Sequence, residues 1–167
     1  LKEHNLLIKR RKNYIKTTNS FHRFRVYKNL IAGLDIVRSN QVFVSDITYI
    51  RVGNSFMYLS LITDLYSRMI VGWDLSESLE AAGCLRALKM ALKFVTNPAE
   101  LIHHSDRGSQ YVSDDYTNAL KTNGIKISMC REVLENAHIE RANGTIKNDY
   151  LRRWKIKTEA QLFERME

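Results

Sequence analysis

The sequence predicts a mixed α/β fold, in which a five-stranded sheet is flanked by helices. Residues 41–50, 56–64 and 68–75 are rich in β-branched and aromatic residues and are separated by short turn signals. After residue 78, helical periodicity alternates with two shorter strand-like runs. The predicted order is β-β-β-α-β-α-β-α. Strand hairpins followed by alternating helices and strands are typical of a mixed sheet with helices on its faces.

The first three strands are predicted to form an antiparallel meander. Gly53-Asn54-Ser55 is a favourable hairpin connection between the first two strands. Tyr66-Ser67-Arg68 is expected to turn the chain into the third strand.

A first helix is expected after Ser78, whose hydroxyl is a favourable helix cap, and it is expected to end at Asn97-Pro98. Its apolar face is formed by residues at spacings of three and four, namely Leu85, Leu88, Leu92 and Val95.

The second half of the chain alternates strands and helices. We predict a strand over 101–106, a helix over 113–122 capped by Ser113, a strand over 125–128, a long helix over 135–154 and a final helix from Thr158. Asn123-Gly124 is a typical helix end.

The composition is that of one globular domain. The chain has 167 residues, of which 44% are hydrophobic and 26% charged. No apolar run approaches the ~18 residues that a membrane helix needs. Cys84 and Cys130 stand alone in the sequence, so we expect two reduced thiols in a cytosolic protein.

The positive charge is concentrated at the start of the chain. Residues 1–28 hold nine Lys or Arg and one acid, so this segment carries a net charge of +8. The whole chain has the same net charge of +8, so the remaining residues cancel one another. We therefore divide the chain into a basic arm over 1–38 and a core over 39–167. An arm with a cluster such as Arg10, Arg11 and Lys12 is suited to bind nucleic acid, although it also fits a solubilising tail or a linker.

Two aspartates occupy strand positions where charge is poorly tolerated. Asp46 lies within the apolar run 42–50, and Asp106 ends the strand 101–106. If these two strands are neighbours, the carboxylates converge, and carboxylate oxygens are the ligands that Mg²⁺ and Mn²⁺ prefer. Taken singly, each aspartate also fits a turn or a cap. Asp64 is a weaker candidate, which fits better as a turn residue or as a partner of Arg68.

A third carboxylate lies on a polar stripe of the helix predicted over 135–154. The stripe consists of residues at helical spacing, namely Asn136, Glu140, Asn143 or Gly144, and Lys147. It fits a solvated helix face, or a site in which Glu140 reaches a metal ion while Lys147 holds a phosphate. His104 shares a strand face with Asp106 and either packs or orients a water molecule.

Several ordered motifs carry a family resemblance. The runs 44–50 (VSDITYI), 61–73 (LITDLYSRMIVGW), 104–111 (HSDRGSQY) and 135–141 (ENAHIER), followed by Lys147, resemble the catalytic core of bacterial insertion-sequence transposases. These enzymes belong with the retroviral-integrase-like enzymes, and the resemblance implies a ribonuclease-H-like fold.

The resemblance also implies chemistry. Asp46, Asp106 and Glu140 match an Asp-Asp-Glu triad that holds two divalent ions, Mg²⁺ or Mn²⁺, and catalyses DNA nicking and strand transfer. Lys147 matches a position that contacts element-end DNA, and Asn136 and Arg141 lie beside it. His104 and Asn143 are expected to support the triad. The alternatives are an inactive DNA-binding remnant and a ribonuclease-H-type nuclease.

The resemblance implies DNA, at element ends and at the target, as the partner, and self-association on paired ends. The chain opens at Leu1 and stops at Glu167, within the expected final helix. We therefore expect it to be a fragment of a longer protein.

Overall fold

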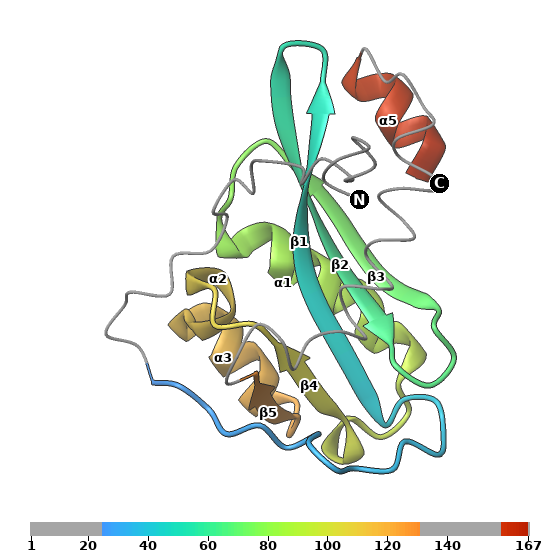
Figure 1. The fold of residues 1–167 in the computed structure, drawn as a ribbon, viewed down its shortest axis with the longest axis vertical. Coiled ribbons are helices and arrows are strands. Elements are labelled where there is room, and N and C mark those ends of the chain that lie inside the picture. Colours follow the sequence, from blue (N-terminus) through green and yellow to red (C-terminus); the bar gives the residue numbers. More distant parts are fainter. Residues whose placement is uncertain (1–24, 131–157, 167) are drawn as a thin grey trace, which may run out of the picture.

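Five strands form one mixed sheet in the order β3-β2-β1-β4-β5. The computed structural model describes residues 25–130 and 158–166 (Figure 1). The first three strands are antiparallel neighbours, whereas β1, β4 and β5 run parallel. The five-stranded mixed sheet predicted from the sequence is therefore confirmed. The strands are β1 (Val42–Val52), β2 (Ser55–Asp64), β3 (Ile70–Ser76), β4 (Ile102–Ser105) and β5 (Lys126–Met129).

The predicted meander and both of its turns are confirmed. Val52 pairs with Ser55, so a two-residue loop joins β1 to β2, with Gly53 at a φ of 57° that favours glycine. At the second turn, the Asp64 carboxylate accepts a hydrogen bond from the Ser67 hydroxyl at 2.6 Å. Asp64 is thus a turn residue, and the ion pairs found among the described residues do not include one between Asp64 and Arg68.

The first helix, α1 (Ala81–Ala91), starts later than predicted and ends before the predicted stop at Asn97-Pro98. The residue at its N-cap is Glu80, whose side chain makes no capping hydrogen bond, so the prediction of a Ser78 cap is wrong. The Leu79 carbonyl instead accepts a hydrogen bond from the side chain of Gln110 at 2.9 Å. This contact ties the chain before α1 to the short helix α2 (Ser109–Val112). A 3₁₀ turn, η1 (Leu92–Phe94), follows the helix, and a second, η2 (Pro98–Glu100), precedes β4.

The buried face of α1 is made mostly of small residues rather than of the predicted leucines. Leu88 is buried, but Leu85 and Leu92 are only half-buried. The other buried residues are Gly83, Cys84, Ala87 and Ala91. These small side chains let the backbone of α1 approach β3 closely at Gly72, which has no side chain of its own.

The two other predicted helices that the structure describes, α3 and α5, follow the predictions, and one short helix is added. Helix α3 (Asp114–Thr122) is capped by Ser113, whose hydroxyl accepts a hydrogen bond from the Tyr116 backbone N–H at 3.4 Å, and Gly124 follows it at a φ of 71°. The short helix α2 (Ser109–Val112) was not predicted. The predicted helix over 135–154 lies outside the described residues, and α5 (Glu159–Met166) is the predicted final helix.

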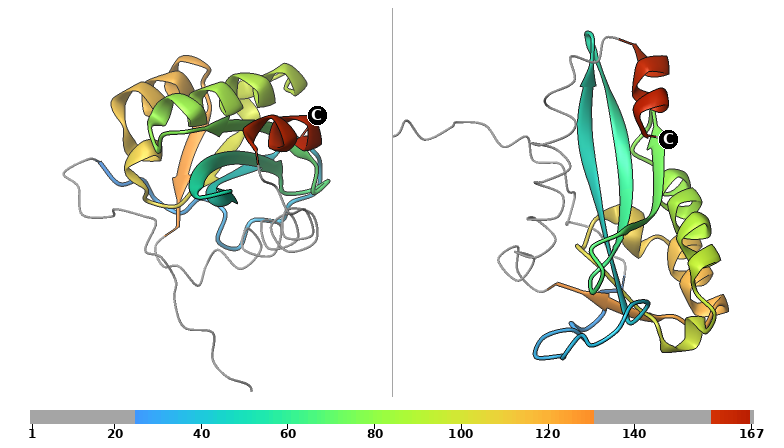
Figure 2. Two further views of the ribbon diagram at one scale, coloured as in Figure 1. Left: turned by 90° about the horizontal axis from the view of Figure 1, so that it is seen from above. Right: turned by 90° about the vertical axis from the view of Figure 1, so that its right-hand side faces the viewer.

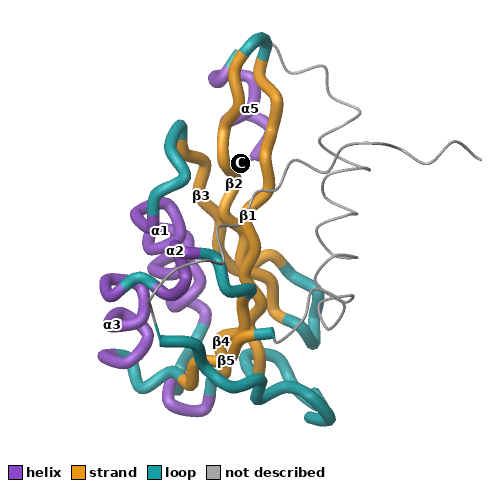
Figure 3. Tube along the Cα trace, turned by 60° about the vertical axis from the view of Figure 1, so that its left-hand side comes forward, coloured by secondary structure: helices purple, strands orange, loops and turns teal. Residues whose placement is uncertain are grey.

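Helices α1, α2 and α3 form one layer against the sheet (Figures 2 and 3). The main core lies between this layer and the sheet, with Phe43, Leu88, Tyr116 and Leu120 among its buried members. The hairpin of β1 and β2 extends beyond the helical layer, and Leu162 of α5 packs in a second cluster with hairpin residues (Figures 1 and 3). Among the described helices, none is both long and apolar enough to cross a membrane.

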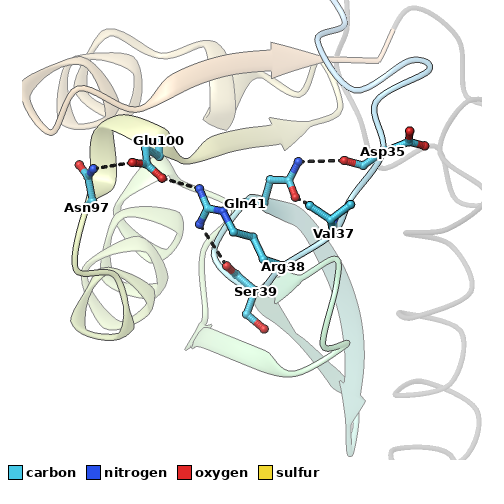
Figure 4. A network of polar contacts seen from close by, with 7 residues as sticks. All are labelled: Asp35, Val37, Arg38, Ser39, Gln41, Asn97 and Glu100. Carbon is cyan, nitrogen blue, oxygen red and sulfur yellow. Dashed lines mark hydrogen bonds and ion pairs between the residues drawn. The ribbon is translucent and has the colours of Figure 1, made fainter.

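Polar contacts anchor the segment that leads into β1 (Figure 4). The Gln41 side chain donates to the Asp35 carbonyl and accepts from the Val37 N–H, both at 2.9 Å. Arg38 forms an ion pair with Glu100 of η2. These exposed contacts add little stability.

Cys84 and Cys130 are both buried and are not joined in a disulfide, in agreement with the predicted reduced thiols. Burial raises the pKa of the Cys84 thiol to about 11. The thiol is therefore uncharged and unreactive at neutral pH.

Candidate active site

The parallel pairing of β1 with β4 brings Asp46 and Asp106 together. The last paired residues of this ladder are Ser45 and Ser105, and each aspartate is the next residue in the chain. Neighbouring strands lie ~4.8 Å apart. The two aspartates are therefore adjacent in space although 60 positions separate them in the sequence.

The two carboxylates line one small pocket. Asp106 comes from the loop after β4, where its Oδ1 accepts a hydrogen bond from the Gly108 N–H at 2.9 Å. Asp46 comes from the middle of β1. The complete lining is Asp46, Ile47, Tyr49, Leu79, Asp106, Gly108, Gln110 and Tyr111.

A neutral phenol lies beside the two carboxylates. Tyr111 is 3% exposed and lies on the short helix α2. Burial raises its pKa well above the ordinary value, and the charges of Asp46 and Asp106 act in the same direction. Tyr111 therefore stays protonated and adds no further negative charge to the pocket.

A buried polar cluster lies on the helix side of the sheet beneath these positions. His103 Nε2 lies 2.6 Å from the Ser45 hydroxyl and 2.9 Å from the Tyr116 hydroxyl. The cluster thus joins β1, β4 and α3 immediately before the two aspartates. Burial, together with the neighbouring His104, lowers the pKa of His103 to about 3, so the imidazole is neutral near pH 7.

This pKa predicts a loss of stability in acid. The unfolded chain binds a proton at His103 below about pH 6.5, but the folded protein does so only near pH 3. The unfolded state is therefore favoured as the pH falls from 6.5 towards 3, by up to ~1.4 kcal/mol per pH unit. Urea unfolding of the wild type and of His103→Phe at pH 7 and pH 4.5 measures how much of the stability lost in acid comes from His103. The carboxylate contributions, common to both proteins, cancel in the comparison. We expect a smaller loss of stability in the variant, and equal losses would contradict the prediction.

His104 is fully buried, and its Nδ1 lies 2.8 Å from the Ser128 hydroxyl of β5. The same hydroxyl accepts a hydrogen bond from the Leu30 N–H at 2.8 Å. His104 is not among the residues that line the pocket. Through the Ser128 hydroxyl, these hydrogen bonds connect β4 with β5 and with the segment before β1.

The other predicted site residues lie outside the described residues, so the structure does not place them relative to the pocket. They are Arg10, Arg11, Lys12, Asn136, Glu140, Arg141, Asn143 and Lys147. In residues 25–130 and 158–166, no group of three or more His, Cys, Asp or Glu side chains is arranged to hold a metal ion. The structure therefore brings together two members of the predicted triad.

Sequence reasoning missed six of the residues that line the pocket, namely Ile47, Tyr49, Leu79, Gly108, Gln110 and Tyr111. Both tyrosines belong to motifs that carried the family resemblance, but strand and helix periodicity alone does not tell which side chains share a pocket. The hydrogen bond from Gln110 to the Leu79 carbonyl spans 31 positions, and no local signal predicts it.

The donor set of the pocket fits a hard divalent cation. Asp46 and Asp106 offer carboxylate oxygens, and no sulfur or imidazole ligand is among the described residues that line the pocket. Such oxygen ligands suit Mg²⁺ and Mn²⁺.

Comparisons with known proteins identify the relatives of this chain. Residues 37–133 match the family model of the integrase core domain. The chain is 38% identical over 158 residues to an uncharacterized 31 kDa protein of insertion element IS600 from Shigella sonnei, an alignment that covers 93% of the chain and 58% of that protein. It is 39% identical over 129 residues to the transposase of insertion sequence element IS629 from Shigella sonnei, which covers 75% of the chain and 43% of that protein.

Solved structures share the fold at low sequence identity. The HTLV-2 integrase catalytic core domain in complex with magnesium superposes with a TM-score of 0.55 at 20% identity, over 66% of this chain and 69% of that one. The catalytic domain of Mos1 mariner transposase gives a TM-score of 0.61 at 13% identity, over 76% of this chain and 68% of that one. The predicted ribonuclease-H-like fold is therefore confirmed.

The chain spans about half the length of the curated relatives that it matches. The family match itself begins before β1, ends just beyond β5 and includes both pocket aspartates. The resemblance inferred from the sequence motifs is thus confirmed, and the chain belongs to the integrase core domain family.

Proposed function

We propose that this chain is the catalytic core of an insertion-sequence transposase, which nicks DNA and transfers the freed strand to a target phosphodiester. The observation that supports this most directly is the adjacency of Asp46 and Asp106 at the end of the β1–β4 ladder. The family match and the similarity to transposases agree with it. Relatives longer than this chain carry further regions, so the proposal concerns the core chemistry.

Divalent ions, Mg²⁺ or Mn²⁺, are the proposed cofactors, and Asp46, Asp106 and Glu140 are the proposed ligands. Bound at this position, they would supply Lewis-acid stabilisation of the attacking and leaving oxygens of a phosphodiester. The Gly108 N–H donates to the Asp106 carboxylate and so restricts its orientation. Two ions are expected once DNA contributes its own phosphate oxygens.

DNA is the proposed partner. Arg10, Arg11 and Lys12 of the basic arm, with Asn136, Arg141 and Lys147, are the proposed contacts to its phosphates. The net charge of +8 favours binding of a polyanion. His104 and Asn143 are proposed to support the ligands, and self-association on paired DNA ends stays a prediction.

A nicking and disintegration assay on branched DNA tests the proposal. We expect activity that requires Mn²⁺ or Mg²⁺ and that disappears in Glu140→Gln, which keeps the shape of the side chain but removes its charge. Glu100→Gln changes an exposed glutamate in η2 and serves as the matched control. Activity that survives Glu140→Gln would show that the assignment of the triad is wrong.

A further inference from the structure

The two faces of the β1–β2 hairpin differ sharply where it extends beyond the helical layer (Figures 1 and 3). One face carries Ile50, Val52 and Met57, which are buried in a cluster with Leu162 of α5. The pleat places the side chains of the intervening residues on the opposite face. There the sequence puts aromatic and basic residues, namely Tyr49, Arg51, Phe56 and Tyr58.

These four residues form two directly opposed pairs, which we call the hairpin strip. Tyr49 is the register partner of Tyr58, and Arg51 is the partner of Phe56. The two tyrosine rings meet edge to face, with centroids 4.9 Å apart. Phe56 is 46% exposed, Arg51 is exposed and both tyrosines are partly exposed. Cross-strand pairs of this kind stabilise a hairpin, but that role does not require an exposed phenylalanine beside an arginine.

The hairpin strip is continuous with the candidate active site. Tyr49 lines the pocket together with Asp46 and Asp106. Two residues of β1, Ile47 and Thr48, lie between Asp46 and Tyr49, which places them ~10 Å apart along the strand. The pleat puts the Asp46 side chain on the face opposite the strip, so the pocket that both residues line is the place where a nucleotide held at the carboxylates would come near Tyr49.

The charge of the strip suits a nucleic acid. Arg51 donates from Nε to the Gly53 carbonyl at 3.2 Å and belongs to neither ion pair found among the described residues. No acidic residue lies in the hairpin between Asp46 and Asp64. A guanidinium beside aromatic rings is the combination that binds the backbone and bases of an unpaired strand.

We propose that the hairpin strip stacks an unpaired base of the DNA strand adjacent to the reacting phosphate, while Arg51 contacts the phosphate backbone of that strand. The inference rests on the proposed function, because it assumes that the phosphate lies at Asp46 and Asp106. Bases within a duplex are already stacked and do not present a free face to the rings. The strip therefore distinguishes frayed DNA from fully paired DNA.

Binding of two DNA substrates tests this inference. One substrate carries 2-aminopurine as an unpaired nucleotide next to the nick site, and the other is fully paired at that position. For the 167-residue chain we expect quenched 2-aminopurine fluorescence and tighter binding of the unpaired substrate. Tyr58→Ala and Phe56→Ala should each reduce this preference about fivefold or more, since stacking on an aromatic side chain is lost. Tyr58→Phe keeps the ring and should retain the preference.

Exposed aromatic residues elsewhere provide the controls. Tyr66, in the turn between β2 and β3, is 52% exposed, and Phe94 of η1 is 50% exposed. Tyr66→Ala and Phe94→Ala should leave both the quenching and the preference unchanged. Arg51→Gln should weaken binding of both substrates alike and reduce the salt dependence of binding by about one counterion.

The outcomes separate the two proposals. If Tyr58→Ala and Phe56→Ala retain the quenching and the preference while wild-type DNA nicking stays metal-dependent, the stacking inference is wrong and the proposed function stands. If the wild-type chain shows no metal-dependent nicking, the proposed function itself fails. Circular dichroism melting of each variant identifies any loss that comes from unfolding.

Discussion

Replacing Asp46 or Asp106 with asparagine is expected to lower the rate of metal-dependent DNA nicking by at least ~10²–10³-fold, the size of effect seen when one preorganised electrostatic contact is removed from an active site. The amide keeps the size of the side chain but is a neutral and weaker ligand for a hard cation. The rate of nicking at saturating Mn²⁺ measures the effect.

The same substitutions should leave the metal-free protein as stable as the wild type or more stable. The two carboxylates are adjacent at the end of the β1–β4 ladder, so removing one charge relieves repulsion. Mn²⁺ should raise the melting temperature of the wild type, because a ligand that binds only the folded state stabilises it, but not that of either variant.

Asp115→Asn provides the matched control for these variants. Asp115 is exposed in the first turn of α3 and does not line the pocket. It should keep both the nicking rate and the stabilisation by Mn²⁺. A wild-type nicking rate in Asp46→Asn or Asp106→Asn would show that the pocket takes no part in the reaction.

Gly72→Ala is expected to destabilise the fold by ~3 kcal/mol or more, at the upper end of the cost of overpacking a core. A Cβ at residue 72 would lie 2.2 Å from the Ala87 carbonyl oxygen and 3.0 Å from the backbone nitrogen of Ala91. Both obstacles are backbone atoms of α1, so the helix must shift away from β3. Urea denaturation at pH 7 measures the free energy of unfolding.

Gly83→Ala is the informative comparison, because it adds the same methyl group on the other side of the interface. Its Cβ would meet the Ser76 hydroxyl at 2.6 Å and the Asp74 carboxylate at 3.0 Å, and both are side-chain atoms that can shift at the cost of their hydrogen bonds with Arg86. Replacing glycine by alanine in a helix also gains ~1 kcal/mol of helix propensity. Gly83→Ala should therefore be much less destabilising than Gly72→Ala. Equal effects would show that the clash at Gly72 does not limit the packing of α1.

Local sequence patterns predicted most of the elements. The hairpin at Gly53, the cap at Ser113 and the helix end at Gly124 depend on backbone conformations and hydrogen bonds that only a few residues on either side decide. The start of α1 could not be predicted in this way. The chain just before the helix is held by a contact between Leu79 and Gln110, which lie far apart in the sequence.

The candidate active site shows the same contrast between what the local sequence predicts and what distant contacts decide. The sequence identified Asp46 and Asp106 as chemically important, because apolar neighbours make a charge costly and the surrounding motifs resemble those of a known family. Their common pocket depends on the parallel register of β1 with β4, and so does the approach of Tyr111. Residue types and local conformation are thus encoded within a few neighbouring positions. Which side chains meet is decided by strand pairing and helix packing, because these contacts join segments that are distant in the chain.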